Sequence, residues 1–251
     1  MLRTQYVEIF HLLFIRHLEQ KLDKNLYAIK GGCNLRFFFK SIRYSEDIDF
    51  DIRTIAPSTL QNKINKLLES IALKQSLKSS GIEIIKISES KQTETTQRWK
   101  ISLQVTGESL PLATKIEFSR RQMNDNFKFE TIDNEIIQLY KLYPIVANHY
   151  IREEAFNQKV NALINRTETQ ARDIFDLNLL LEGKVDLSLF NQDLKGNLDT
   201  AISNLNSINF ADFKGQVVAY LMSEYQDYYD SPKIWEEIKN TVTVALRELQ
   251  S

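Results

Sequence analysis

An alternation of acidic and apolar residues constrains this chain more than any other feature. The segment reads Ser45-Glu46-Asp47-Ile48-Asp49-Phe50-Asp51. Successive side chains of a strand point to opposite faces, so a strand here places Asp47, Asp49 and Asp51 together on one face. Like charges on one face repel each other, and acidic residues are depleted from strands. A divalent cation such as Mg²⁺, which prefers oxygen ligands, removes this repulsion, so the pattern favours a metal-binding strand.

A Gly-Gly pair upstream supplies the second half of a candidate site. An apolar strand is expected over 25–29, and Lys30, Gly31 and Gly32 follow it, with helical character from Asn34 to Lys40. Glycine has no Cβ, so its backbone N–H can approach a phosphate closely, and a helix N-terminus favours an anion. The pair alone favours an ordinary strand-to-helix turn. Together with the acidic strand, it predicts a site for a triphosphate and a metal.

Composition narrows the class of protein. The 251 residues fit one large domain or two small ones, and a hydrophobic content of 43% is typical of a globular chain. The net charge of −1 excludes a globally basic surface, although a local basic patch remains possible. Cys33 is the single cysteine, which excludes an internal disulfide and a cysteine metal cluster. With no signal peptide and no membrane-length apolar run, we expect a cytoplasmic protein that does not enter a membrane.

The first half of the chain predicts a small sheet with helices. The expected elements are helices over 2–22 and 58–77, and strands over 82–87, 98–105 and 112–118, the last two joined by a turn at Gly107-Glu108. Glu117 lies on the last of these strands. From the alternation alone it is an ordinary glutamate on the polar face, paired with Lys115 or Arg120.

The second half is expected to be helical. No later segment has a strong strand pattern, so we place the domains at 1–132 and 133–251. Amphipathic helices are expected over 151–164 and 169–181, followed by three or four short helices. The last region is aromatic, with Tyr220, Tyr225, Tyr228, Tyr229 and Trp235. These rings either pack the helices together or stack on the bases of an RNA.

Charged residues in the two amphipathic helices form a second candidate group. The ammonium of Lys159 is suited to a triphosphate as a flexible point charge. Asp173 and Asp176 are three residues apart and share one helix face. The alternative is an ion-pair network that holds the two helices together. For Arg43, which precedes the acidic strand, contact with the site and a solvated loop position are both open.

Two stretches resemble a known family. Lys30-Gly31-Gly32, Leu35-Arg36 and Arg43-x-Ser45-x-Asp47-Ile48-Asp49-Phe50 resemble the polymerase-β-like nucleotidyltransferases, and more closely the AbiEii/AbiGii toxins of bacterial toxin–antitoxin systems, which include the MenT-type toxins. The downstream segment from Lys159 to Leu177 is also similar to that family. The resemblance implies an α/β fold, in which a small mixed-sheet nucleotidyltransferase core is followed by a helical half that completes the active-site cleft.

The resemblance also implies an activity and a set of site residues. It implies an NTP-dependent nucleotidyltransferase toxin of a type IV-like system, with an acceptor such as the 3′ end of a tRNA and a cognate antitoxin as partner. The implied metal is Mg²⁺, or Mn²⁺ in its place, held by Asp47, Asp49 and Glu117. The other implied catalytic residues are Lys159 and Asp176. The implied nucleotide-binding residues are Lys30, Gly31, Gly32, Arg43, Ser45, Lys159, Arg172 and Asp173.

Three other functions fit the same residues. The chain could transfer a terminal phosphate, as a kinase does, or bind a nucleotide as a regulator without catalysis. The acidic strand could also be a structural metal site in an interaction protein.

Overall fold

The acidic alternation forms the central strand of a mixed sheet. The computed structural model describes residues 1–121 and 123–250, which fall into two compact units. The first, here called the sheet unit, comprises Met1–Phe38 and Tyr44–Tyr150, and the second, the helical unit, comprises Phe39–Arg43 and Ile151–Ser251. The predicted α/β class, a small mixed sheet combined with helices, is confirmed.

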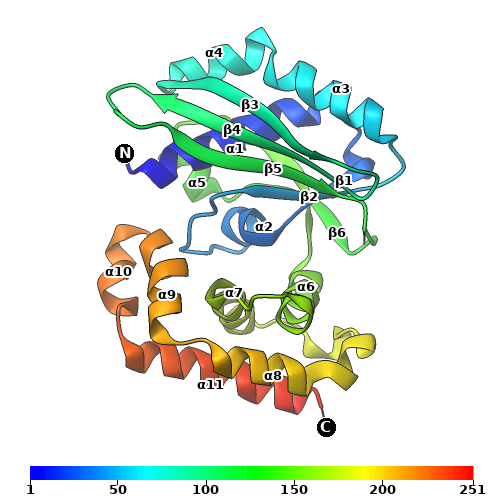
Figure 1. Cartoon of the computed structure of the whole chain (residues 1–251), viewed down its shortest axis with the longest axis vertical. Coiled ribbons are helices and arrows are strands. Elements are labelled where there is room, and N and C mark those ends of the chain that lie inside the picture. The colour runs from blue at the N-terminus through cyan, green and yellow to red at the C-terminus, as the bar shows by residue number, and fades with distance from the viewer. Residues whose placement is uncertain (122, 251) are drawn as a thin grey trace. The chain divides into compact units, whose positions relative to one another are not determined.

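The sheet has seven strands in the order β3-β4-β5-β2-β1-β7-β6 (Figure 1). β2 runs parallel to β5, β1 runs parallel to β7, and the other neighbouring pairs are antiparallel. The strands are β1 (Tyr27–Lys30), β2 (Ile48–Ile52), β3 (Ile82–Gln92), β4 (Thr96–Val105), β5 (Leu112–Ser119), β6 (Phe127–Thr131) and β7 (Val146–Tyr150). The expected hairpin between β4 and β5 is present.

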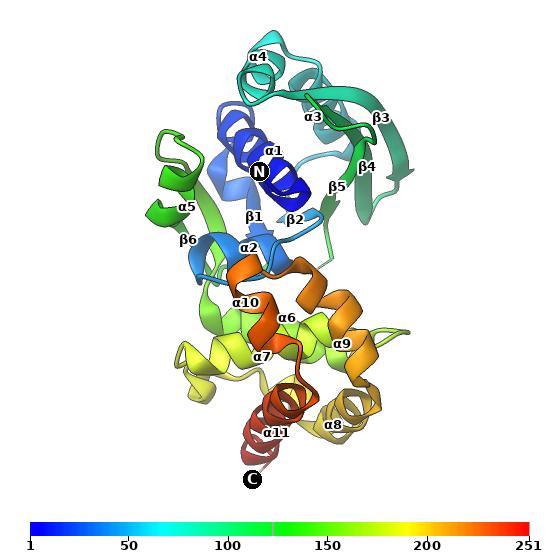
Figure 2. The same cartoon turned by 90° about the vertical axis from the view of Figure 1, so that its left-hand side faces the viewer.

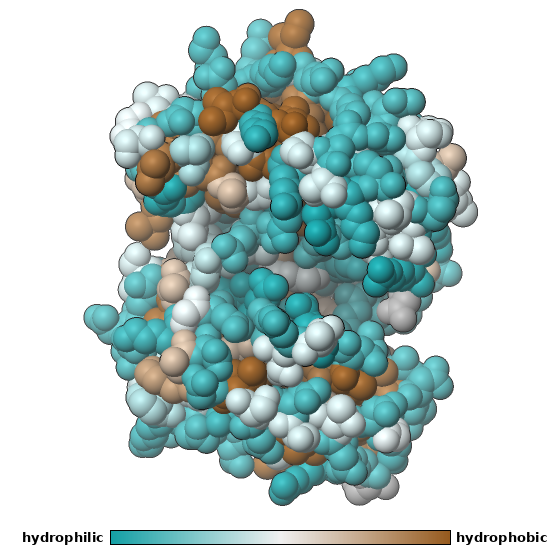
Figure 3. All heavy atoms as spheres, viewed as in Figure 1, coloured by the Kyte–Doolittle hydropathy of each residue, from teal (hydrophilic) through white to brown (hydrophobic). Residues whose placement is uncertain are grey.

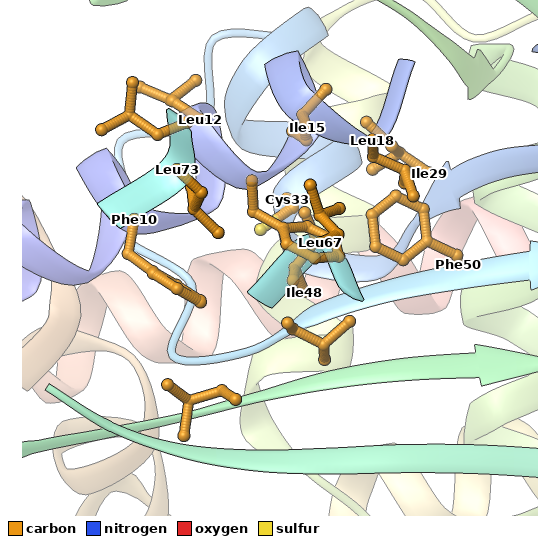
Figure 4. Close-up of a cluster of buried hydrophobic side chains, with 14 of the residues drawn as sticks. Phe10, Leu12, Ile15, Leu18, Ile29, Cys33, Ile48, Phe50, Leu67 and Leu73 are labelled. Carbon is orange, nitrogen blue, oxygen red and sulfur yellow. The ribbon is translucent and has the colours of Figure 1, made fainter. Parts of the chain in front are cut away.

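Helices enclose one side of the sheet. They are α1 (Arg3–Glu19), α3 (Pro57–Leu68) and α4 (Ile71–Ser79), whereas α2 (Gly31–Phe38) follows β1, and the short α5 (Asn134–Leu139) lies between β6 and β7. Figure 4 shows the core that they bury, in which Phe10, Leu12, Ile15 and Leu18 of α1 lie near Ile29, Ile48, Phe50, Leu67 and Leu73. The single helix expected over 58–77 is two helices, because Ser70 caps a new one by accepting a hydrogen bond from Leu73 N.

The sheet unit extends beyond the boundary expected at residues 132 and 133. It also contains β6 and β7, which the sequence pattern does not indicate. β7 is short, and its centre is the polar pair Asn148 and His149, both buried. His149 Nδ1 lies 3.0 Å from Asn34 Oδ1, and its ring stacks on Phe38. Polar residues that are satisfied in the interior hide this strand from a hydrophobic pattern.

The helical unit is built on the pair α6 (Arg152–Asn165) and α7 (Ala171–Glu182), close to the two helices expected. α8 packs on α6, and α11 packs on α7 and α8 (Figure 2). The remaining helices are α8 (Leu198–Ser207), α9 (Phe210–Gln216), α10 (Ser223–Tyr229) and α11 (Pro232–Glu248). Trp235 is fully buried and stacks on Phe213, with ring centroids 4.5 Å apart, so this ring packs helices. Among the described residues, no helix has the length and apolar character needed to span a membrane.

Candidate active site

Gly31 brings the backbone close to the acidic strand. It begins α2 directly after β1 and has a φ of +65°, in the left-handed region that favours glycine. A Cβ at this position would lie 3.2 Å from Asp49 Oδ2. Glycine therefore allows both the turn and the close approach of the turn to a carboxylate.

Two of the expected metal-binding acids lie side by side. Asp49 of β2 is the direct cross-strand partner of Glu117 of β5, so the two side chains share a face. The neighbours of Asp49 in the strand, Ile48 and Phe50, are fully buried on the opposite face. The alternation in the sequence thus puts the apolar residues into the core and Asp49 next to Glu117.

Asp49 lies in an environment that opposes its negative charge. Burial raises the pKa of this carboxyl above its ordinary value, and the negative charges of Glu117 and Asp47 raise it further. Lys30 and Lys115 act in the opposite direction without cancelling the increase. An additional cation beside Asp49 would therefore stabilise its ionised form.

The other acids of this region already have partners. Asp47 lies 2.7 Å from Lys115 Nζ, and Glu117 lies 2.6 Å from Arg98, not from the Lys115 or Arg120 considered from the sequence. Asp51 is buried and accepts hydrogen bonds from Lys30 Nζ at 2.6 Å and from Tyr150 Oη at 2.9 Å. Asp51 and Lys30 therefore form an ion pair with each other. They lie beside Asp47, Asp49 and Glu117, which we call the acid group.

The acid group has the chemistry that a hard divalent cation requires. Asp47, Asp49 and Glu117 offer carboxylate oxygens, which are the ligands that Mg²⁺ prefers. Among residues 1–121 and 123–250, no three His, Cys, Asp or Glu side chains are already gathered as a metal site. The donor set fits Mg²⁺, provided that Asp47 and Glu117 exchange Lys115 and Arg98 for the ion.

A set of polar side chains fixes the backbone just before β2. Ser45 Oγ and Cys33 Sγ donate to the Asp47 carbonyl at 2.9 Å and 3.3 Å, and Thr114 Oγ1 donates to the Glu46 carbonyl at 2.7 Å. We call these three side chains, together with His11, the carbonyl clamp. The clamp holds the acidic segment to α2 and β5. The nucleotide-binding role expected for Ser45 stays a prediction, and its hydroxyl contacts the backbone of Asp47.

His11 completes the carbonyl clamp. Its Nε2 lies 2.7 Å from Thr114 Oγ1, whose proton is already donated to Glu46. The hydroxyl oxygen must therefore accept a hydrogen bond from a protonated Nε2. Burial lowers the pKa of His11 to about 3, so the ring is neutral at physiological pH. The sequence places His11 and Thr114 far apart and gives no signal of this contact.

Cys33 also belongs to the carbonyl clamp. The thiol is buried, and burial raises its pKa well above the ordinary value. Its sulfur also lies 3.6 Å from His11 Nδ1. The side chain thus supports the backbone of Asp47.

The second group of expected residues lies in the helical unit, where it forms a buried ion network. Lys159 Nζ lies 2.9 Å from Asp173 Oδ1 and 2.6 Å from Asp176 Oδ2. Arg43 and Arg166 add ion pairs at 3.1 Å to Asp176 and at 2.9 Å to Asp173. Both carboxylates are fully buried, and each of them is paired with two cations.

Asp176 is the electrostatic opposite of Asp49. Burial opposes its ionisation, but the neighbouring Arg43 and Lys159 outweigh burial and hold its pKa below the ordinary value. Arg43 belongs to the short segment Phe39–Arg43 of the helical unit, and its backbone forms a bridge to Leu221. Arg172 of α7 is half-buried. The catalytic or nucleotide-binding roles expected for Lys159, Asp176, Asp173, Arg172 and Arg43 remain predictions.

Comparison with known families decides the assignment. Residues 12–233 match the family described as the nucleotidyl transferase AbiEii toxin of type IV toxin–antitoxin systems. This chain belongs to the AbiEii family. An AbiEii protein is a nucleotidyltransferase toxin, and its membership of a type IV system implies an antitoxin partner.

Solved structures share the AbiEii fold seen here. JHP933 from Helicobacter pylori is 20% identical, with a TM-score of 0.63, over 100% of this chain and 93% of that chain. MenT4, the nucleotidyltransferase toxin Rv2826c from Mycobacterium tuberculosis H37Rv, is 16% identical, with a TM-score of 0.59, over 98% of this chain and 92% of that chain. At these identities the likeness concerns the fold alone. No curated protein matches the sequence.

Proposed function

We propose that this AbiEii toxin transfers a nucleotide from an NTP to an RNA acceptor such as the 3′ end of a tRNA, in a reaction that depends on Mg²⁺. In this proposal a cognate antitoxin neutralises the activity. The observation that carries it is the position of Asp49 beside Glu117 and against the Gly31 turn. An acid whose pKa is raised by its neighbours, next to a glycine turn at the start of a helix, suits a metal and a phosphate together.

The proposed roles follow from the positions of the side chains. Asp47, Asp49 and Glu117 would hold Mg²⁺, which supplies charge neutralisation for the triphosphate and lowers the pKa of the incoming hydroxyl. The backbone at Gly31 and Gly32 would bind phosphate oxygens. The acceptor hydroxyl oxygen forms a bond to the α-phosphorus, the bond to the β-phosphate oxygen breaks, and pyrophosphate leaves. The hydroxyl proton passes to a carboxylate or to water.

Labelled nucleotides test this proposal. The protein is incubated with Mg²⁺, bulk tRNA and each NTP in turn, labelled at the α-phosphate in one series and at the γ-phosphate in another. We expect α-label to reach the RNA, γ-label to appear in pyrophosphate, and both to be lost in Asp49→Asn. Glu83→Gln is the matched control, because Glu83 is an exposed acid on β3, opposite Gln104.

Two results would contradict the proposal. Transfer of γ-label to RNA or protein would indicate kinase chemistry on the same scaffold. No label on RNA with any NTP would exclude an RNA acceptor under these conditions. Label from the α-phosphate on protein would then identify a protein as the acceptor.

A further inference from the structure

A group of basic side chains continues from the acid group across the sheet toward β3. We call Lys86, Lys91, Arg98, Lys100 and Lys115 the cationic ladder. Building on the proposed function, we propose that the cationic ladder binds the phosphate backbone of the RNA acceptor and leads its terminal hydroxyl to Asp49 and Glu117. The partner is therefore a polyanionic strand, and its contacts are with phosphates.

The register of the sheet places the cationic ladder on the same face as the acids. Lys91 of β3 pairs with Arg98 of β4, Arg98 pairs with Glu117 of β5, and Glu117 pairs with Asp49 of β2. Direct cross-strand partners share a face, so these four side chains form one continuous row. The row leads from the edge of the sheet to the acid group.

Two further rows carry the remaining lysines. Lys100 pairs with Lys115 in the next row, and Lys86 lies in the row of Ser102 and Ala113. Rows on one face are two residues apart, about 7 Å, so Lys86 lies about 13 Å along the strands from the row of Glu117. This span exceeds the length of one triphosphate and calls for a longer anion.

This face of the three strands is open to solvent. The opposite face of β4 is buried toward the helices and carries Trp99, Ile101 and Leu103. Lys86 and Lys100 are exposed, and Lys91 is partly exposed. Figure 3 shows a group of apolar side chains at the level of β3 and β4, with hydrophilic side chains beside and below it.

The charges of the cationic ladder are not balanced within the described structure. Lys100 and Lys115 are direct cross-strand partners of like charge, an arrangement that destabilises a sheet. Arg98 and Lys115 pair with Glu117 and Asp47. In the described parts of the chain, Lys86, Lys91 and Lys100 have no carboxylate within ion-pair distance. Three unbalanced cations beside an acid group suit an anion with several phosphates.

The order of charges along this face selects one orientation of the strand. The acids, with their proposed metal, suit the end that carries the reacting hydroxyl, and the lysines suit the phosphates behind it. Contacts to phosphates carry no sequence information, so the cationic ladder would set the position of the RNA and not its identity. It also supplies the local basic patch that a chain of net charge −1 needs to bind RNA.

The test compares two triple variants of equal charge. The first is Lys86→Gln, Lys91→Gln and Lys100→Gln on the open face. The second, the matched control, is Lys66→Gln, Lys74→Gln and Lys78→Gln, because these exposed lysines lie on α3 and α4 of the same unit. Binding of fluorescently labelled tRNA is measured without NTP over a range of salt concentrations. The KM for tRNA is measured separately in the labelled-nucleotide assay.

We expect the first variant to lose at least about tenfold in tRNA affinity at low salt, and the slope of log K against log salt to fall by about 2 to 3. The KM for tRNA should rise while thermal stability and NTP binding stay unchanged, and the control should behave as the native protein. Equal affinity and slope in the native protein and the first variant would overturn the inference. An equal loss of tRNA affinity in the control variant would also overturn it. So would a first variant that binds tRNA as the native protein does but is no longer neutralised by the antitoxin.

The two proposals fail separately. If the native protein binds tRNA through the cationic ladder but transfers no nucleotide, the proposed function is wrong and the binding surface stands. If it transfers nucleotide to tRNA and the first variant keeps the native KM, the activity stands and the cationic ladder is not the binding surface.

Discussion

Asp49 in the sheet unit and Asp176 in the helical unit are aspartates in opposite electrostatic states. The pKa of Asp49 is raised by burial and by two neighbouring acids, whereas that of Asp176 is lowered because Arg43 and Lys159 outweigh burial. The first carboxylate lacks a sufficient positive partner, and the second already has two. The family resemblance implies a catalytic role for both and metal binding for Asp49 alone, and of the two only Asp49 is in a state that an external cation would stabilise.

This contrast separates two uses of an acid that is partly or wholly removed from solvent. A carboxylate that is fully paired stabilises the fold, and removing it leaves its cations buried without a counterion. A carboxylate crowded by other acids destabilises the fold and gains from a ligand. Stability and activity should therefore respond in opposite ways when each one is neutralised.

The largest expected effect is on transfer by Asp49→Asn. We expect a loss of about 10³-fold or more in transfer, because a group that acts in the transition state is removed. Its raised pKa means that the ionised form costs stability as pH rises through the folded pKa, so the variant should melt at a higher temperature than the native protein at neutral pH without divalent ions. Calorimetry in the presence of a chelator measures the melting temperature, and the labelled-nucleotide assay measures transfer. A lower melting temperature for Asp49→Asn than for the native protein would contradict the electrostatic contrast between Asp49 and Asp176.

Asp176→Asn should mainly affect stability. Breaking a buried ion pair costs about 3–5 kcal/mol, so the helical unit should unfold at a lower denaturant concentration. Because the pKa of Asp176 is lowered, its contribution is present above the ordinary aspartate value of about 3.9 and is lost at lower pH, so the difference from the native protein should shrink there. The exposed Asp227→Asn on α10 is the control and should change little. Native stability with lost transfer would instead give Asp176 a direct role.

Thr114→Val tests the carbonyl clamp. The substitution keeps the shape but leaves the Glu46 carbonyl and His11 Nε2 without this hydroxyl, at a cost of about 1–3 kcal/mol. Transfer should fall more than NTP binding, because the backbone next to Asp47 loses one of the three side chains that hold it. Thr131→Val, at an exposed position of β6, is the matched control. Unchanged unfolding of Thr114→Val would show that the carbonyl clamp contributes nothing to stability.

The smallest expected effect is a shift in pH dependence in Lys115→Gln. Lys115 lowers the pKa of Asp49, so its loss should raise that pKa further and move the acid limb of the pH–rate profile to higher pH. The half-exposed pair with Asp47 contributes at most about 1 kcal/mol, so the melting temperature should hardly change. The exposed Lys128→Gln on β6 should leave the acid limb in place. If the acid limb of the pH–rate profile does not move in Lys115→Gln, the ionisation of Asp49 does not determine that limb.

Much of the fold follows from the sequence because its patterns are local. The alternation at Ile48 and Phe50, the three strands β3 to β5, and the amphipathic helices α6 and α7 all bury an apolar face at the expected period. β7 is missed because buried Asn148 and His149 interrupt its apolar pattern. The break between α3 and α4 is missed because it depends on one serine cap.

The site is harder to predict because its contacts join distant segments. The sequence pairs Asp49 with Glu117 only through the family resemblance, and for Arg43 it leaves open contact with the nucleotide site or a solvated loop position. The structure instead pairs Arg43 with Asp176. The partnership of His11 and Thr114 depends on tertiary packing, which no local pattern encodes.

The segment Phe39–Arg43 also has a consequence for biosynthesis. It leaves the ribosome between α2 and β2, yet its partners Asp176 and Leu221 are made only after the whole sheet unit. The helical unit therefore cannot mature until late in translation, and cleavage after Tyr150 would separate it from Arg43. A toxin built this way cannot be divided at one peptide bond into two complete modules, and a truncated nascent chain lacks the finished helical unit.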